Sequence, residues 1–280
     1  MTALLGVLGH PVAHSLSPAM HSAAFDALGL DAAYVAIDVP VGRLARTLAE
    51  LRRLDARGLN VTMPLKEAIV PLLVAIDDEA SAIGAVNTLL PDPHGWRGTN
   101  TDAEGLLRSL EESGVGVECA SVVVLGAGGA ARAAVHGLTR AGAAEMTVVA
   151  RRVAQADVLL QHLGPARRRA VDLADESSLV RAFERADLVV QATGASLQAN
   201  SARDLVERLP LACMPATAAI IDLVYRPRCT ALLEQASARG LRTVDGIGML
   251  VHQGAHAFEQ WLGLRPPTAA MRAAVERALG

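Results

Sequence analysis

The sequence predicts an α/β protein with two domains: an N-terminal α/β domain with a mostly parallel sheet, and a C-terminal, doubly wound domain of the Rossmann type. Short apolar runs alternate with longer segments of helical periodicity, as in right-handed βαβ units. A length of 280 residues suits one large or two medium domains, and 51% hydrophobic residues permit a sizeable core. A glycine-rich loop opens the second set of apolar runs.

Eight apolar runs are candidate strands, and six longer segments are candidate helices. The strands are ALLGVLG, AAYVAID, GLNVT, GAVNTLL, SVVVLGAG, MTVVAR, LVVQAT and AAIIDLV, and the helices cover residues 18–28, 42–54, 101–113, 130–141, 246–261 and 268–279. No strands follow the last two helices, so we expect these helices to pack onto the first domain. The predicted domains are residues 1–103 with 241–280, and residues 104–240.

Composition excludes several classes of function. A net charge of −3 offers no basic face for nucleic acid, and the run Arg167–Arg169 is short enough to be a solvated edge. Three scattered cysteines form no CxxC pair, which predicts neither a disulfide framework nor a metal site and fits a reducing cytoplasm. The N-terminal run lacks a cationic leader, and no apolar stretch approaches the ~20 residues of a membrane helix. We therefore expect a cytoplasmic protein with a small-molecule ligand.

The glycine loop lies in VVVLGAGGAARAA, between an apolar strand and a helix. Its spacing is the G-x-G-x-x-G/A pattern of dinucleotide-binding domains, in which glycines let backbone N–H groups approach a pyrophosphate at a helix N-terminus. The predicted cofactor-binding residues here are Gly126, Ala127, Gly128, Gly129, Ala130 and Ala131. The next strand ends in Arg151 and Arg152 and carries no acidic residue for a ribose 2′-hydroxyl. Two guanidinium groups suit a 2′-phosphate, so the sequence favours NADP over NAD.

Polar side chains gather at the expected strand ends of the first domain. Asn60 and Thr62 share one face of GLNVT, and Lys66, the only lysine in the chain, follows Pro64. Asn87 and Asp102 come at similar positions further along. Ligands of open α/β sheets bind at the carboxyl edge of the strands, so these residues are candidate ligand contacts, although Asn and Asp at turns are most often simple caps.

Three further side chains are candidates. Ser15 and Ser17 lie in the loop HSLSP, where Ser17 before Pro18 is also a possible helix N-cap. Gln253 lies on the helix that begins near Gly246. Although the loop and helix after the first strand carry His10, His14 and His21, no acidic companion is evident in the sequence, so we predict no metal site.

Seven sequence blocks resemble, in order, those of the shikimate dehydrogenase family. They are GHPVAHSLSPAMH, GLNVTMPLKE, IGAVNTL, GTNTD, LGAGGAARA, DLVYRPRCTALL and DGIGMLVHQGAHAF. The resemblance implies NADP-dependent, reversible reduction of 3-dehydroshikimate to shikimate, in the pathway to chorismate and the aromatic amino acids, by a monomer or homodimer. It implies that the N-terminal domain binds the substrate.

The resemblance also implies a role for each matching residue. Lys66 and Asp102 would be the catalytic pair. Substrate would contact Ser15, Ser17, Asn60, Thr62, Lys66, Asn87, Asp102, Tyr225 and Gln253, and the cofactor would contact the glycine loop, the Arg151 region, Leu223 and Gly246. Lysine suits its role, because reduction of a ketone leaves an alkoxide that needs both a proton and a nearby charge, and arginine does not release protons in proteins.

Departures from the family pattern keep alternatives open. Arg152, Gln155, Gln191 and Gly194 occupy positions where the family usually has other residues, which leaves the detail of 2′-phosphate binding and the wall near the nicotinamide undecided. The alternatives are a quinate/shikimate dehydrogenase that uses NAD, an aminoshikimate-type enzyme, and a non-catalytic NADP-binding sensor on the same fold.

Overall fold

The computed structural model describes residues 2–161 and 167–280, which form two compact α/β units. The first unit contains residues 1–105 and 250–280, and the second contains residues 106–249. The boundaries fall inside two helices, α5 (Asp102–Glu112) and α11 (Ile247–Leu262). The chain thus passes twice between the units, as the predicted discontinuous first domain requires.

A six-stranded mixed sheet forms the centre of the first unit, with strand order β2-β1-β3-β5-β6-β4. The strands are β1 (Ala3–Gly9), β2 (Ala32–Asp38), β3 (Gly58–Val61), β4 (Ala75–Ile76), β5 (Thr88–Asp92) and β6 (Gly95–Thr99). Strand β1 pairs in parallel with β2 and β3, whereas β5 pairs antiparallel with both β3 and β6. The reversal arises because β5 and β6 form a hairpin closed by Pro93 and His94.

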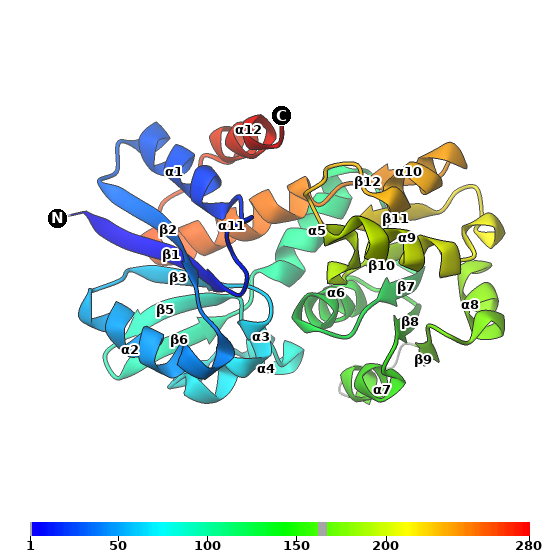
Figure 1. Ribbon diagram of the computed structural model, residues 1–280, viewed down its shortest axis with the longest axis horizontal. Coiled ribbons are helices and arrows are strands. Elements are labelled where there is room, and N and C mark those ends of the chain that lie inside the picture. The colour runs from blue at the N-terminus through cyan, green and yellow to red at the C-terminus, as the bar shows by residue number, and fades with distance from the viewer. Residues whose placement is uncertain (1, 162–166) are drawn as a thin grey trace. The chain divides into compact units, whose positions relative to one another are not determined.

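Helices cover both faces of this sheet (Figure 1). The first unit contains α1 (Ser17–Leu28), α2 (Leu44–Arg53), α3 (Leu65–Ala68), α4 (Asp78–Ile83) and α12 (Thr268–Leu279), together with most of α11 and the short 3-10 helices at Val41–Arg43 and Val70–Leu72. Leucines of α2 and α3 pack with Leu8, Leu59 and Leu89 of the strands. On the other face, α1 packs on β1, β2 and α12.

The second unit contains a six-stranded parallel sheet with strand order β12-β11-β10-β7-β8-β9. Its strands are β7 (Ser121–Leu125), β8 (Glu145–Ala150), β9 (Arg167–Asp172), β10 (Leu188–Gln191), β11 (Ala219–Asp222) and β12 (Arg242–Val244). Strand β12 shows that residues 241–249 belong to this unit, whereas the sequence prediction placed them in the first domain. Its three residues, Arg-Thr-Val, form too short and polar an edge strand to be recognised as an apolar run.

Two hydrophobic layers enclose the second sheet, because its central strands alternate apolar side chains to both faces. Helices α6 (Gly129–Arg140) and α7 (Val153–Gln161) pack on Val122, Val124 and Val148. Helices α8 (Glu176–Phe183), α9 (Ala199–Arg208) and α10 (Ala231–Ala238) pack on the opposite face, which carries Val123 and Val149. Short 3-10 helices at Gly194–Leu197 and Leu211–Cys213 complete this unit. The predicted doubly wound arrangement is confirmed.

Candidate active site

The polar side chains of the first unit meet at one edge of its sheet. Strands β1 and β3 are parallel, so their carboxyl ends lie together, and the His10 N–H donates to the Met63 carbonyl across the loops that follow them. The antiparallel pairing of β5 brings its first residue, Thr88, opposite both Asn60 and Thr99. The start of β5 and the end of β6 therefore lie at the edge where β1 and β3 end.

Lys66 and Asp102 form an ion pair at this edge. Lys66 is the second residue of the short helix α3, and Asp102 is the first residue of α5. The Lys66 Nζ and Asp102 Oδ2 atoms are 2.5 Å apart, and the two side chains are only 15% and 5% exposed. The second carboxylate oxygen, Oδ1, accepts a bond of 2.8 Å from Asn87 Nδ2. Both oxygens of the buried carboxylate are thus partnered, as a charged group away from water requires.

Asn87 connects most of the groups at this edge. Its Nδ2 donates to Thr101 Oγ1 at 3.0 Å as well as to Asp102, and its Oδ1 accepts from the Thr101 backbone N–H and the Thr88 hydroxyl at 2.8 Å each. Asn87, Thr88 and Thr101 are at most 2% exposed. The side chain of Asn87 therefore fixes the turn that delivers Asp102. Thr88 was missed as a site residue, although its place directly after Asn87 at a strand start was the signal for it.

Asn60 lies beneath these residues on β3, and its amide is bonded within the protein. Its Nδ2 donates to the Asn87 carbonyl at 3.1 Å and to Thr88 Oγ1 at 3.2 Å, while its Oδ1 accepts from the Tyr34 hydroxyl at 2.6 Å. The two N–H groups are committed to protein acceptors, so an additional ligand has one remaining lone pair on Oδ1 to use. Tyr34, on the neighbouring strand but one, was not identified from the sequence, because strand pairing alone brings it to Asn60.

Gln253 reaches the same group from α11. Its Oε1 is 3.5 Å from Asn87 Nδ2, and its Nε2 donates to the Leu250 carbonyl at 2.7 Å. The helix approaches closely because Gly105 has no side chain: a Cβ there would lie 2.7 Å from the Cβ of Gln253. A close helix contact at Gly105 therefore positions Gln253.

Ser15, Ser17 and Thr62 lie in the loops at this edge. Ser15 Oγ accepts from the Ser17 backbone N–H at 3.3 Å, and Ser17 is buried as the first residue of α1. Leu16 is the N-cap of α1, and no side-chain hydrogen bond caps the helix, so the possible capping role of Ser17 is not seen. Within the described residues, no hydrogen bond joins these three hydroxyl groups to the Lys66–Asp102 pair.

The glycine loop of the second unit lies between β7 and α6, as the motif predicts. Gly126 has φ +115°, and a Cβ there would lie 2.9 Å from Thr193 Cγ2, so both backbone and packing require glycine. A Cβ on Gly128 would meet open space instead. Helix α6 begins at Gly129 without a side-chain cap, which leaves its first N–H groups available to an anion. The loop therefore has both the space and the donors that a pyrophosphate needs.

The other predicted cofactor residues follow the carboxyl ends of three strands in the same sheet, β8, β11 and β12. Arg151 and Arg152 are exposed after β8, Leu223 follows β11 and Gly246 follows β12. Leu223 approaches Gly246 so closely that a Cβ on the glycine would lie 2.7 Å from the Leu223 carbonyl oxygen. Tyr225, predicted to contact substrate, is half-buried in the loop after β11 in this second unit.

Buried polar groups brace the strand ends beside these residues. The Asp222 carboxylate accepts from Ser196 Oγ at 2.7 Å, Thr230 Oγ1 at 2.8 Å and the Val224 N–H at 3.0 Å. Burial raises the pKa of Asp222, and these three hydrogen bonds oppose the increase. Gln191 is fully buried, and its amide bonds Thr193 and Ser196. This departure from the family pattern is therefore part of an internal network that the sequence did not reveal.

Neither metal ligation nor membrane insertion is supported by the described residues. No group of three or more His, Cys, Asp or Glu side chains in them is placed to hold a metal ion. His10 does have an acidic neighbour, contrary to the sequence interpretation, because its Nδ1 lies 2.6 Å from Asp38 Oδ1 at an exposed position. None of the helices within residues 2–161 and 167–280 is long and apolar enough to cross a membrane.

Comparison with protein families identifies domains along nearly the whole chain. Residues 7–89 match the shikimate dehydrogenase substrate binding domain, and residues 246–276 match the shikimate 5′-dehydrogenase C-terminal domain. Residues 122–244 match the saccharopine dehydrogenase NADP binding domain. The residues gathered at the edge of the first sheet thus fall largely within a region similar to known substrate-binding domains.

Individual relatives are similar over their full length. A shikimate dehydrogenase (NADP⁺) of Symbiobacterium thermophilum is 44% identical over 99% of this chain and 94% of its own. The crystal structure of shikimate 5-dehydrogenase from Thermus thermophilus in complex with NADP(H) and shikimate is 41% identical, with a TM-score of 0.86 over 99% of this chain and 100% of that one. Quinate dehydrogenase from Corynebacterium glutamicum in complex with NAD is 32% identical, with a TM-score of 0.87 over 99% of both chains.

Proposed function

The chain belongs to the shikimate dehydrogenase family, and from this premise we propose that it catalyses the reversible, NADP-dependent interconversion of 3-dehydroshikimate and shikimate. The observation that carries the proposal is the ion pair between Lys66 and Asp102, buried among amide and hydroxyl groups. Lys66 is the only lysine in a sequence whose other basic residues of this kind are all arginines. Its ammonium suits a step that transfers a proton, because arginine does not deprotonate in proteins. The same pair argues against a non-catalytic sensor, which has no use for proton transfer.

Lys66 acts on the carbonyl oxygen of the substrate in the proposed mechanism. Addition of hydride to the carbonyl carbon leaves a negative charge on that oxygen, and the Lys66 ammonium stabilises it and donates the proton that completes the alcohol. The neutral amine is then reprotonated from solvent. In the oxidation of shikimate, the neutral amine accepts the hydroxyl proton instead. Asp102, itself held by Asn87, keeps Nζ in one place and balances its charge.

The remaining polar residues of the first unit bind and orient the substrate. Ser15 and Ser17 receive its carboxylate, and Thr62, Asn87, Asp102 and Gln253 bind its ring hydroxyls. Asn60 has one free lone pair, so its contribution is chiefly to hold Asn87 and Thr88 in position. Tyr225 contributes a further substrate contact from the loop after β11.

NADPH, when bound, supplies the hydride for reduction. The uncapped N–H groups of α6 and the open space above Gly128 fit its pyrophosphate, and Ala127, Ala130 and Ala131 complete the loop. Arg151 and Arg152 bind the 2′-phosphate, which is supported by their exposure at the end of β8 and by the absence of an acid beside them in the sequence. Leu223 and Gly246 contact the cofactor further along the same sheet edge.

We also infer that the first unit is the substrate domain and the second the NADP domain, in a cytoplasmic monomer or homodimer. Support for this compartment comes from Cys119, Cys213 and Cys229, which are all free and exposed. Exposed free thiols suit a reducing environment.

A spectrophotometric assay tests the proposal directly. Formation of reduced nicotinamide is followed at about 340 nm with shikimate or quinate as the polyol and NADP⁺ or NAD⁺ as the oxidant. The expected result is the largest kcat/KM with shikimate and NADP⁺. Preferred oxidation of quinate with NAD⁺ would assign the chain to the quinate branch instead. Absence of turnover with all four pairs would contradict the enzymatic function.

A further inference from the structure

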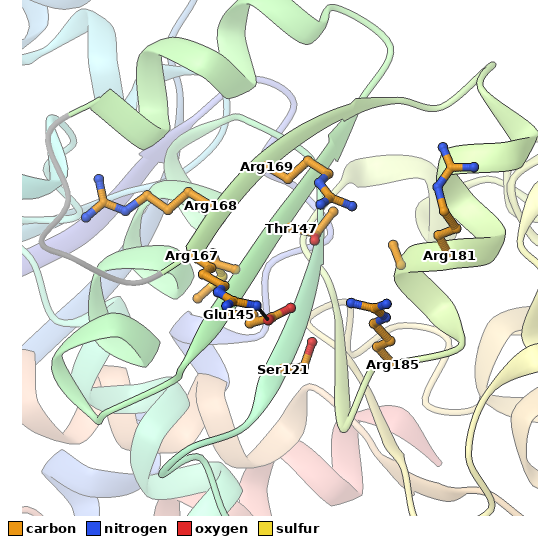
Figure 2. Close-up of a pocket in the computed structure, with 10 residues that line it drawn as sticks. Ser121, Glu145, Thr147, Arg167, Arg168, Arg169, Arg181 and Arg185 are labelled. Carbon is orange, nitrogen blue, oxygen red and sulfur yellow. Dashed lines mark hydrogen bonds and ion pairs between the residues drawn. The ribbon is translucent and has the colours of Figure 1, made fainter.

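Arginines line a hollow in the second unit, at the sheet edge opposite the glycine loop. Its lining includes Arg167, Arg168, Arg169, Arg181 and Arg185 (Figure 2). Ser121, Glu145 and Arg167 begin β7, β8 and β9, whereas Gly126 and Arg151 follow the other ends of β7 and β8. Strands of five or six residues separate the two edges by roughly 16–20 Å, so this hollow is distinct from the predicted cofactor loop.

Strand pairing explains which arginines face the hollow. Arg167 pairs with Glu145 and Arg169 with Thr147, so these four side chains share one face of the sheet, the face on which α8 packs. Arg168 points away from the other labelled arginines in Figure 2, and its Nη1 donates to the Leu160 carbonyl on α7 at 2.7 Å. Arg168 therefore does not belong to the arginines that face the hollow.

Helix α8 and the turn after it also carry arginines at the hollow, and these do not belong to the exposed edge strand β9. Strand β9 is an edge strand, and charged residues such as Arg167 and Arg169 commonly prevent such an edge from pairing with another chain. Arg181 and Arg185 come instead from α8 and the turn after it, and they line the same hollow. The arginines that line the hollow thus come from two separate elements.

The arginines around the hollow exceed the acidic groups that could neutralise them. Arg167 is paired with Glu145 at 3.2 Å, and Asp187, the second acid at this edge, accepts from the Ser121 N–H at 2.8 Å. Arg181 bonds the hydroxyl groups of Ser177 and Ser178. Hydrogen bonds from Ser178 and Ser177 lower the pKa of Asp175, and the positive charge of Arg181 adds to this effect, so Asp175 offsets part of that charge. Within the described residues, the side chains of Arg169 and Arg185 have no hydrogen bond or ion pair.

From this arrangement we propose that the hollow is a binding site for a small phosphate-bearing anion with at least two negative charges. The forked guanidinium groups of Arg169 and Arg185 match phosphate oxygens bidentately. Thr147 and Ser121 provide hydroxyl donors on the floor of the hollow. The site is separate from the proposed catalytic function and does not depend on it.

Calorimetric titration with pyrophosphate tests the site, using the full chain at low ionic strength with and without saturating NADP⁺. The double variant R169Q/R185Q is compared with R203Q/R239Q, which removes two exposed charges of the same unit outside the hollow, one on α9 and one in the turn after α10. We expect R169Q/R185Q to bind pyrophosphate at least tenfold more weakly than the wild type, and R203Q/R239Q to bind it within twofold. Circular dichroism and NADP⁺ affinity of both variants should equal those of the wild type.

Citrate, titrated at matched ionic strength, tests the preference for phosphate, and we expect it to bind at least fivefold more weakly. Several outcomes overturn the proposal: no binding of millimolar pyrophosphate to the wild type, loss of binding on addition of NADP⁺, or an equal loss in both double variants. NADP⁺ competition would assign the binding to the glycine loop, and equal losses would indicate unspecific attraction to net charge. Equal affinity for citrate would overturn the assignment to phosphate.

Discussion

The first unit buries polar groups in two regions that differ in almost every respect. Around Asn87, each buried amide, hydroxyl and carboxylate has a hydrogen-bond partner, and an ion pair persists at 2.5 Å. His21 is equally buried, at 0% exposure, yet neither ring nitrogen has a partner within the described residues. It lies among Phe25, Tyr34, Phe258 and Trp261.

Tyr34 lies between the two regions and contacts both of them. Its hydroxyl donates to Asn60 on the polar side, while its ring stacks on His21 with centroids 4.3 Å apart and planes 12° apart. Burial lowers the pKa of His21 to about 3, so the ring stays neutral. The contrast teaches that burial alone does not decide whether a group is charged. What decides it is whether a hydrogen-bond or ion-pair partner lies within bonding distance.

Replacement of Lys66 should have the largest effect on activity, because it removes one member of the buried Lys66–Asp102 ion pair. We expect K66M to lower kcat by about 10²–10⁴-fold while shikimate still binds, because the proton donor is lost but the amides and hydroxyls remain. K66R is the matched control, since arginine keeps a positive charge but does not release its proton at neutral pH. Steady-state kinetics and shikimate titration measure both. Near wild-type turnover in K66R would show that charge alone suffices.

Removal of Asn87 should be the next largest effect. N87A removes the acceptor of the Thr101 N–H and the donor to one oxygen of the Asp102 carboxylate. We therefore expect a loss of about 2–4 kcal/mol in the free energy of unfolding. Urea unfolding at pH 7.5 measures the loss. A change below about 0.5 kcal/mol would mean that water replaces the amide and that the region is less closed than its burial indicates.

Acid should destabilise the fold through His21. The folded pKa of about 3 lies below the ordinary value of 6.5, so the unfolded chain binds a proton that the folded chain excludes. Stability contributed by the neutral ring is therefore complete above pH 6.5 and declines as the pH falls toward 3. The expected decline from this residue is about 2 kcal/mol at pH 5.

The variant H21F separates this contribution from those of other titrating groups. A phenyl ring keeps the stacking on Tyr34 and has no proton to bind, so its unfolding free energy should fall about 2 kcal/mol less than that of the wild type between pH 7.5 and 5. Urea unfolding at several pH values provides the measurement. Identical pH profiles for the two proteins would place the acid sensitivity elsewhere.

Y34F should have the smallest effect, because it removes the hydrogen bond to Asn60 and keeps the ring that stacks on His21. The expected loss is about 1 kcal/mol in the free energy of unfolding, with the acid dependence unchanged. A steeper acid dependence would show that the hydroxyl group influences His21 as well as Asn60. Thermal and urea unfolding at pH 7.5 and pH 5 distinguish the two results.

The parts of the fold that local sequence determines could be predicted well. Strands Ala3–Gly9 and Ala32–Asp38 and helix Thr268–Leu279 have the residues expected for them, because each carries an uninterrupted apolar or periodic pattern. Strands β4, β6, β9 and β12 were not predicted. They are short or rich in arginine and glycine, and pairing with neighbouring strands, which a local pattern does not encode, gives them their structure.

The residues of the candidate site also fall into those that the sequence could identify and those that it could not. The proximity of Lys66, Asn87 and Asp102 follows from strand ends and from the family resemblance, and the structure brings these three residues together. Tyr34 was not identified, because its contact with Asn60 depends on the order of the strands. The isolation of His21 depends on side chains from α1, β2 and α11, which are far apart in the sequence.

The absence of a Cβ atom at Gly105 determines where Gln253 lies. A methyl group there would collide with the main chain of α11, whose Gln253 N and Cα would lie 2.8 and 3.0 Å away. Relief of that collision must move the Gln253 amide away from Asn87, although residue 105 itself offers a ligand nothing to bind. If Gln253 binds substrate as proposed above, a residue that contacts no ligand thus controls the position of one that does.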